Sequence, residues 1–319
     1  MPRPKAGNAR TGPLPLHPMT VADIFDGAFK LLKANARSLF VIVLVLVGPA
    51  QVLAAFATRG LLGGESFLTA FTDPTVIDST AQTQSFWEAA ASFLAVILQL
   101  LLLPFIGGAI SRVVAASYLG EELAPGPALR AVFRRGGSLF AAFLLVHVAE
   151  LLPFLVLGIV GIVLVAAGAF SGGAATAVGV IGFIALVGFG GLWAVAAMPF
   201  FVVVAPAVVV EDLGPIRSCR RSIELVRRRY WPVLGMALLS GLVASMLGNM
   251  LGIGPQIVAA LIGFKWGWII VAAGGIFVSL VVTPFVAIVA TLLYFDLRIR
   301  TEGFDLAVIA ANLGPAGDR

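Results

Sequence analysis

The feature that most constrains this chain is a long stretch almost free of charge. Between Ser138 and Val210 there is one acidic residue, Glu150, and no lysine or arginine. A soluble globule cannot hide so much apolar side chain, because every globule presents some surface to water. About 20 apolar residues cross the hydrocarbon core of a bilayer. The stretch therefore predicts two membrane-spanning helices.

The rest of the chain has the same character. Of its 319 residues 60% are hydrophobic and 12% charged, whereas about a quarter of a typical soluble domain is charged. We predict an all-α fold, a polytopic transmembrane bundle of about six spans. Their approximate ranges are 38–58, 86–111, 138–168, 176–207, 231–252 and 267–295, with short or apolar outer loops at 169–175 and 253–266. Prolines inside these runs predict kinks where neighbouring groups bond the freed carbonyls: Pro49, Pro104, Pro153, Pro199 and Pro284.

The basic residues predict the orientation of the spans. All 21 lysines and arginines except Arg59 and Lys265 fall on one side of the six-span topology, and positive charge marks the cytoplasmic side. Both termini are therefore expected inside, in a bacterial cytoplasmic membrane. We expect a disordered cytoplasmic tail at 1–17, a membrane domain at 18–303 and a cytoplasmic C-terminal tail at 304–319. No cleavable signal peptide is expected, since the first apolar run begins too far into the chain.

The inner segments predict a three-fold internal repeat. Residues 20–37 have the pattern of an amphipathic interfacial helix with Thr20 as its N-cap. The stretch Ala28–Phe40 aligns without gaps onto Ala128–Phe140, and Pro215–Tyr230 is a third basic helix that leads into a span. The even-numbered spans each contain Pro-Phe. The expected repeat units are 18–120, 121–213 and 214–303.

One candidate site lies inside the membrane. His147 and Glu150 are three residues apart on one face of the third span, and an ionisable side chain at that depth is costly enough to suggest a function. With Gln99 they form a candidate polar cluster, serving as a proton relay, a cavity wall or a lipid-headgroup contact. The alternative is that Glu150 is protonated and bonds His147, Gln99 or Gln51 to hold helices together.

A second candidate is the basic helix after the fourth span. Its arginines are candidate contacts to anionic lipid headgroups or to an acidic partner; the alternative is that they only fix the orientation of the spans. The residues are Arg220, Arg221, Arg227, Arg228 and Arg229. A weaker signal is the GxxxG spacing of Gly248 and Gly252, which suggests close helix contact.

The sequence argues against several other classes. It contains no GxSxG, HExxH or CxxC motif, so we expect no catalytic residues and no enzyme activity. With two histidines, one of them His17 in the tail, we expect no metal site and no cofactor. The basic residues flank apolar spans, so nucleic acid is not an expected partner. The single cysteine, Cys219, excludes an intramolecular disulfide.

Both ends of the chain resemble one bacterial family. The segments 18–29, Pro-Met-Thr-Val-Ala-Asp-Ile-Phe-Asp-Gly-Ala-Phe, and 294–306, Tyr-Phe-Asp-Leu-Arg-Ile-Arg-Thr-Glu-Gly-Phe-Asp-Leu, carry the likeness. They resemble integral membrane proteins, common in actinobacteria, that are labelled "glycerophosphoryl diester phosphodiesterase membrane domain". In two-domain relatives the phosphodiesterase is a separate soluble barrel, for which this chain has no room. The resemblance thus implies a membrane domain of unknown role.

These observations lead to two functional hypotheses. The first is a non-enzymatic scaffold or accessory subunit of an envelope-related complex, with membrane lipids and either a membrane-protein partner or a second copy as its contacts. The alternative is a transporter or lipid-handling protein with a polar cavity around His147 and Glu150.

Overall fold

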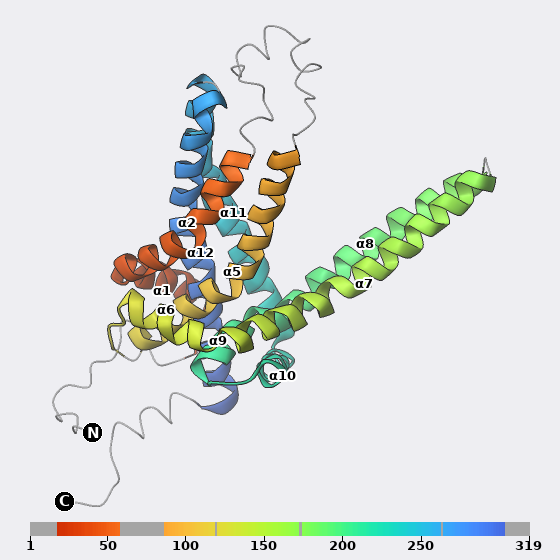
Figure 1. Cartoon of the computed structure of the whole chain (residues 1–319). Coiled ribbons are helices and arrows are strands. Elements are labelled where there is room, and N and C mark those ends of the chain that lie inside the picture. The colour runs from red at the N-terminus through yellow and green to blue at the C-terminus, as the bar shows by residue number, and fades with distance from the viewer. Residues whose placement is uncertain (1–17, 58–85, 119, 172–173, 263, 304–319) are drawn as a thin grey trace, which may run out of the picture. The chain divides into compact units, whose positions relative to one another are not determined.

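A computed structural model describes residues 18–57, 86–118, 120–171, 174–262 and 264–303, and all regular structure in these ranges is α-helical (Figure 1). Six helices are long and apolar enough to cross a membrane, which confirms the predicted fold class and number of spans. Their bounds are α2 Ala36–Ala57, α5 Phe86–Tyr118, α7 Gly136–Ser171, α8 Ala174–Val202, α11 Tyr230–Ile262 and α12 Phe264–Glu302. Four helices are short: α1 Val21–Ala34, α6 Pro125–Arg134, α9 Val204–Val210 and α10 Pro215–Val226.

The predicted outer loop at 253–266 is wrong. Helix α11 continues through Pro255 to Ile262, and α12 begins at Phe264. A proline does not end a membrane helix when neighbouring groups compensate for it. Here the ring of Pro255 packs against Gly274 of α12, where an added Cβ would lie 2.4 Å from the proline Cβ. The segment between the first two spans, which contains Arg59, and both tails lie outside the described residues.

The other prolines also sit inside continuous helices, and one freed carbonyl has a visible partner. Pro153 cannot donate a hydrogen bond to the carbonyl four residues earlier, that of Ala149. The indole Nε1 of Trp193 on α8 donates to this oxygen instead, at 3.3 Å. This is the compensation by a neighbouring helix that the sequence predicted for prolines in the spans.

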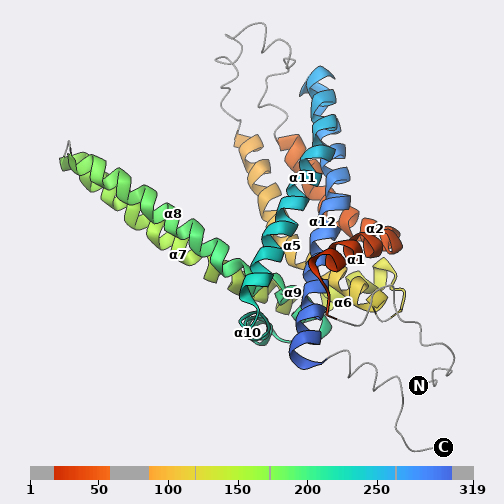
Figure 2. The ribbon, with the colours of Figure 1, turned by 180° about the vertical axis from the view of Figure 1, so that it is seen from behind.

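The described helices group into two compact units. One comprises Met1–Arg135 with Leu239–Arg319, and the other Gly136–Leu238. In the first unit α2 packs against α5 and α12, α1 packs on α12, and α6 packs on α5 (Figures 1 and 2). Aliphatic side chains such as Ile42, Ile110 and Leu292 are fully buried there. The core is thus built from the first two long helices and the last one.

Polar side chains also join the helices of this unit. Gln51 Nε2 donates to Ser279 Oγ at 3.2 Å, and the hydroxyls of Ser111 and Thr291 lie 2.9 Å apart. The sequence offered Gln51 as a partner for Glu150, but its side-chain amide bonds Ser279 of α12. Such bonds act as helix-packing contacts in a medium without water.

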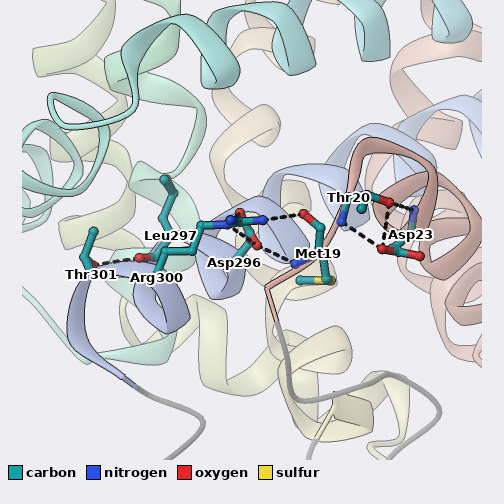
Figure 3. A network of polar contacts seen from close by, with 7 residues as sticks. All are labelled: Met19, Thr20, Asp23, Asp296, Leu297, Arg300 and Thr301. Carbon is teal, nitrogen blue, oxygen red and sulfur yellow. Dashed lines mark hydrogen bonds and ion pairs between the residues drawn. The ribbon is translucent and has the colours of Figure 1, made fainter.

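The two ends of the described chain are bonded to each other in the same unit (Figure 3). Arg300 Nε lies 2.9 and 2.8 Å from the carboxylate oxygens of Asp296, and its Nη2 donates to the carbonyl of Met19 at 2.7 Å. The backbone N–H of Met19 donates to Asp296 at 2.8 Å. We call this arrangement of Met19, Asp296 and Arg300 the terminal clasp. It fixes the entry to α1 against the end of α12.

Helix α1 begins where the sequence predicted. Thr20 accepts a hydrogen bond from the N–H of Asp23 at 3.2 Å, and the Asp23 carboxylate accepts from the N–H of Thr20 at 2.8 Å. This capping box satisfies two backbone donors at the helix start. The predicted apolar stripe is largely correct, since Ile24, Ala28 and Leu31 are buried, but Val21 is exposed.

In the second unit α7 and α8 form an antiparallel pair that lies side by side in both views (Figures 1 and 2). Close contact occurs at Gly161, where an added Cβ would lie 2.6 Å from Phe183 Cδ2. Elsewhere α7 is loosely covered: only 6% of its apolar window is buried, compared with 44% for α2 and 44% for the span Ala177–Val210 that contains α8.

Each predicted interfacial segment forms a short helix, and an aromatic ring in it or just after it contacts the phenylalanine of a Pro-Phe motif. Ring centroids are 5.2 Å apart for Phe105 with Phe133 of α6, and 5.2 Å for Phe285 with Phe29 of α1. Phe200 lies 5.4 Å from Tyr230, just after α10. The gap-free alignment pairs Phe29 with Leu129 and not with Phe133, so these contacts do not test the repeat. The division at 18–120, 121–213 and 214–303 stays a prediction.

Candidate functional site

Helix α10 is held on the second unit by one face. Ser218 and Ser222 are fully buried there; Ser218 Oγ donates to the carbonyl of Pro215 at 2.8 Å, and Ser222 Oγ donates to that of Phe200. Tyr230, at the start of α11, donates to the carbonyl of Ala196 at 2.9 Å. The Ser222 bond reaches α8, whereas the Ser218 bond stays within α10. Because Ser218 and Ser222 are both buried, the opposite face of α10 points outward.

The arginines predicted as contacts divide into two groups. Arg221 pairs with Glu211 at 3.0 Å, with both side chains mostly buried, and exposed Arg220 pairs with Glu224 one helical turn later. Arg227 and Arg228 are exposed and Arg229 is half-buried. Sequence reasoning left out Arg217, which is also exposed. Within the described residues, Arg217, Arg227 and Arg228 form no ion pair, so their charge is directed outward.

Cys219 lies on the docked side of α10. Its side chain is half-buried, and burial raises the pKa of the thiol, which the hydrogen bond with Ser218 offsets only in part. A thiol with a raised pKa carries little thiolate at neutral pH and is a poor nucleophile. These properties indicate a packing residue.

His147 is oriented by its own helix. Its Nδ1 lies 2.9 Å from the carbonyl oxygen of Phe143, and its ring stacks on the Phe143 ring with centroids 3.9 Å apart. A carbonyl oxygen only accepts hydrogen bonds, so Nδ1 must be the donor. In the neutral imidazole this leaves Nε2 as an acceptor.

Glu150 is half-buried on the same helix, and within the described residues it forms no hydrogen bond or ion pair. The carbonyl of the preceding residue, Ala149, is already bonded by Trp193. Gln99 is exposed on α5, in the other compact unit, so its place in a cluster with His147 and Glu150 stays a prediction. The structure thus describes His147, whose Nδ1 is bonded to its own helix, and Glu150, whose carboxyl group has no bonded partner among the described residues.

The glycines of the α7–α8 pair are of two kinds. Gly161 allows close packing between these two helices, since an added Cβ there would lie 2.6 Å from Phe183 Cδ2. Around Gly158, Gly188 and Gly191, however, an added Cβ would meet nothing within 4 Å. These three glycines face open space. Sequence reasoning could not separate the two kinds, because spacing alone does not show which neighbour a glycine faces.

Comparison with known proteins leaves the family open. No family model matches this chain, and comparisons with curated proteins and with solved structures find no match either. The resemblance of the two ends to the phosphodiesterase membrane-domain family therefore stays a prediction. The segments that carry it, around Met19 and around Asp296, are those joined by the terminal clasp.

Proposed function

We propose that this protein is a non-enzymatic membrane scaffold, an accessory subunit that binds another membrane-spanning protein along the α7–α8 pair. The observation that carries this proposal is the outward position of Gly158, Gly188 and Gly191 on an apolar hairpin whose first helix, α7, is largely uncovered. Helix–helix interfaces in membranes are enriched in small residues, because these let two backbones approach closely. Outward glycines are therefore best explained by a helix that packs on them.

The position of the polar pair narrows the chemistry of the partner. Leu144, His147, Leu151, Gly158 and Ile162 follow one another at spacings that keep them on one face of α7, and Glu150 borders this face. His147 Nε2 and the Glu150 carboxylate both offer acceptors. The complementary helix would supply a donor at mid-membrane depth, from a basic, amide or hydroxyl side chain. Such a bond would also compensate the cost of an acidic group in the spans.

The test is photo-crosslinking of the full-length protein in its native membrane. A photoreactive phenylalanine analogue at Leu151 should yield a reproducible product with a second protein, whereas the same probe at its exposed neighbour Leu152, turned by about 100° around the helix, should yield much less. Gly158→Leu and Glu150→Gln should each reduce the Leu151 product. A product with the mass of two copies, or crosslinks only within the chain, would contradict the proposal.

A second candidate function rests on Glu150 alone. An ionisable residue without a partner in a span is also what a lipid-handling or transport site requires. In that case Glu150→Gln should abolish selective retention of a lipid or solute by the purified protein while leaving the Leu151 crosslink unchanged. The two candidates therefore give opposite results in the same variant.

A further inference from the structure

The outward face of α10 combines charge with apolar side chains. Ile216, Arg220, Ile223 and Arg227 follow at spacings of four, three and four residues, which places them on one face. Ile216 is 72% exposed and Ile223 is also exposed, although both could pack inward on an ordinary surface helix. Trp231, at the start of α11, is 76% exposed. Exposed isoleucine and tryptophan beside arginine are typical of a helix in the interface of an anionic membrane.

The connections of α10 keep it close to the membrane. Three residues, Arg227–Arg229, separate it from the span that begins at Tyr230, and four, 211–214, separate it from α9. Since a residue spans at most about 3.6 Å, these links reach roughly 11 and 14 Å. The field of anionic lipids falls off over about 10 Å at moderate ionic strength. The arginines of α10 are thus held within range of the headgroups.

Two other short helices, α6 and α1, each taken by itself, also combine aromatic and basic side chains on their open sides. Helix α6 exposes Phe133 next to Arg130 and Arg134, and α1 exposes Phe29 next to Lys33 and next to Lys30, which pairs with Asp26. A docking site for one protein would need a single such surface. A pattern present on all three helices is better explained by the one ligand that borders all of them, the lipid surface.

From these observations we infer that α10 lies in the headgroup layer of the inner leaflet and binds anionic phospholipid through Arg217, Arg227 and Arg228. Ile216 and Ile223 insert at the boundary between the headgroups and the acyl chains, and Trp231 lies at the same depth. Arg221 has no direct part, because Glu211 already neutralises it. This inference is independent of the proposed partner of the α7–α8 pair.

The experiment uses the full-length protein in nanodiscs of phosphatidylcholine with or without phosphatidylglycerol. After mild extraction, mass spectrometry measures the phosphatidylglycerol that the protein retains. Arg217→Gln/Arg227→Gln/Arg228→Gln should weaken retention by roughly fivefold for each arginine removed. The control Arg3→Gln/Lys5→Gln/Arg10→Gln removes the same charge from the N-terminal tail and should change retention little. Equal losses in both variants, or no loss in the first, would overturn the inference.

A second measurement tests insertion and does not depend on retention. Ile223→Cys in a Cys219→Ser background carries one thiol on the outward face of α10. Its reaction with a water-soluble maleimide should be several-fold slower in nanodiscs with phosphatidylglycerol than in phosphatidylcholine alone. Only protein and lipid are present, so protection identifies lipid as the occupant. Equal labelling rates in both lipids would overturn the inference.

Discussion

At the residue scale, burial separates two ion pairs that look alike in sequence. Asp296–Arg300 and Asp26–Lys30 are both i, i+4 pairs, with N···O distances of 2.8 and 2.6 Å. The side chains of the first pair are 26% (Arg300) and 8% (Asp296) exposed, and those of the second are 60% (Lys30) and 63% (Asp26) exposed. Exposed pairs contribute about 0–1 kcal/mol, whereas removing one partner of a buried pair leaves an uncompensated charge. The Asp296–Arg300 pair of the terminal clasp should therefore contribute far more to stability than the exposed Asp26–Lys30 pair.

Asp296→Asn should destabilise the protein by about 2 kcal/mol, because Arg300 and the N–H of Met19 lose a charged acceptor. Thermal unfolding in detergent measures this change, with Asp26→Asn as the matched control, expected to change stability by less than about 0.5 kcal/mol. Equal effects in the two variants would show that the clasp does not hold α1 on α12.

At the element scale, the sequence predicted the helices well and their ends less well. Periodicity and charge gaps were sufficient for the six spans and for α1, α6 and α10, because in a bilayer nearly every apolar run of sufficient length becomes a helix. The prediction of a loop at 253–266 was wrong because glycine and proline are tolerated inside membrane helices, and α11 continues through Pro255 to Ile262.

The roles of the α11 glycines were also beyond the sequence. An added Cβ at Gly248 would make only ordinary contacts with Val278 and Val282, at 3.8 and 3.9 Å, and one at Gly252 would lie 3.4 Å from Gln256 Nε2. The GxxxG spacing therefore does not mark the tightest contact of this helix. That contact, between Pro255 and Gly274, joins residues far apart in the sequence, and no local motif indicates it.

Gly274→Ala should destabilise the α11–α12 pair by about 1–3 kcal/mol, because the new Cβ would overlap a rigid proline ring. Gly248→Ala, on the partner helix α11, should leave stability unchanged or raise it slightly, since alanine favours the helix. Thermal unfolding of the two variants, each compared with the unmodified protein, measures these changes in stability. Loss of stability at Gly248 but not at Gly274 would restore the GxxxG interpretation.

At the scale of the whole molecule, the candidate sites were only partly predictable. The basic helix and the pair His147–Glu150 follow from charge in an apolar sequence. Sequence could not show that Arg221 is neutralised by Glu211, that Arg217 is exposed, or that His147 donates to Phe143. These facts depend on how each helix is rotated about its axis. Packing against neighbouring helices sets that rotation, and the sequence of one helix does not show it.

Both proposals depend on the predicted membrane topology, in which six helices each cross once and both termini with α1, α6 and α10 are on the cytoplasmic side. Paired reporters that are active only outside or only inside the membrane test this topology most directly, fused after Thr75, Pro125, Gly172, Arg220 and Ile262. The account predicts an inside signal at Pro125 and Arg220 and an outside signal at the other three. An inside signal at Gly172 would show that α7 and α8 do not cross, and would contradict it.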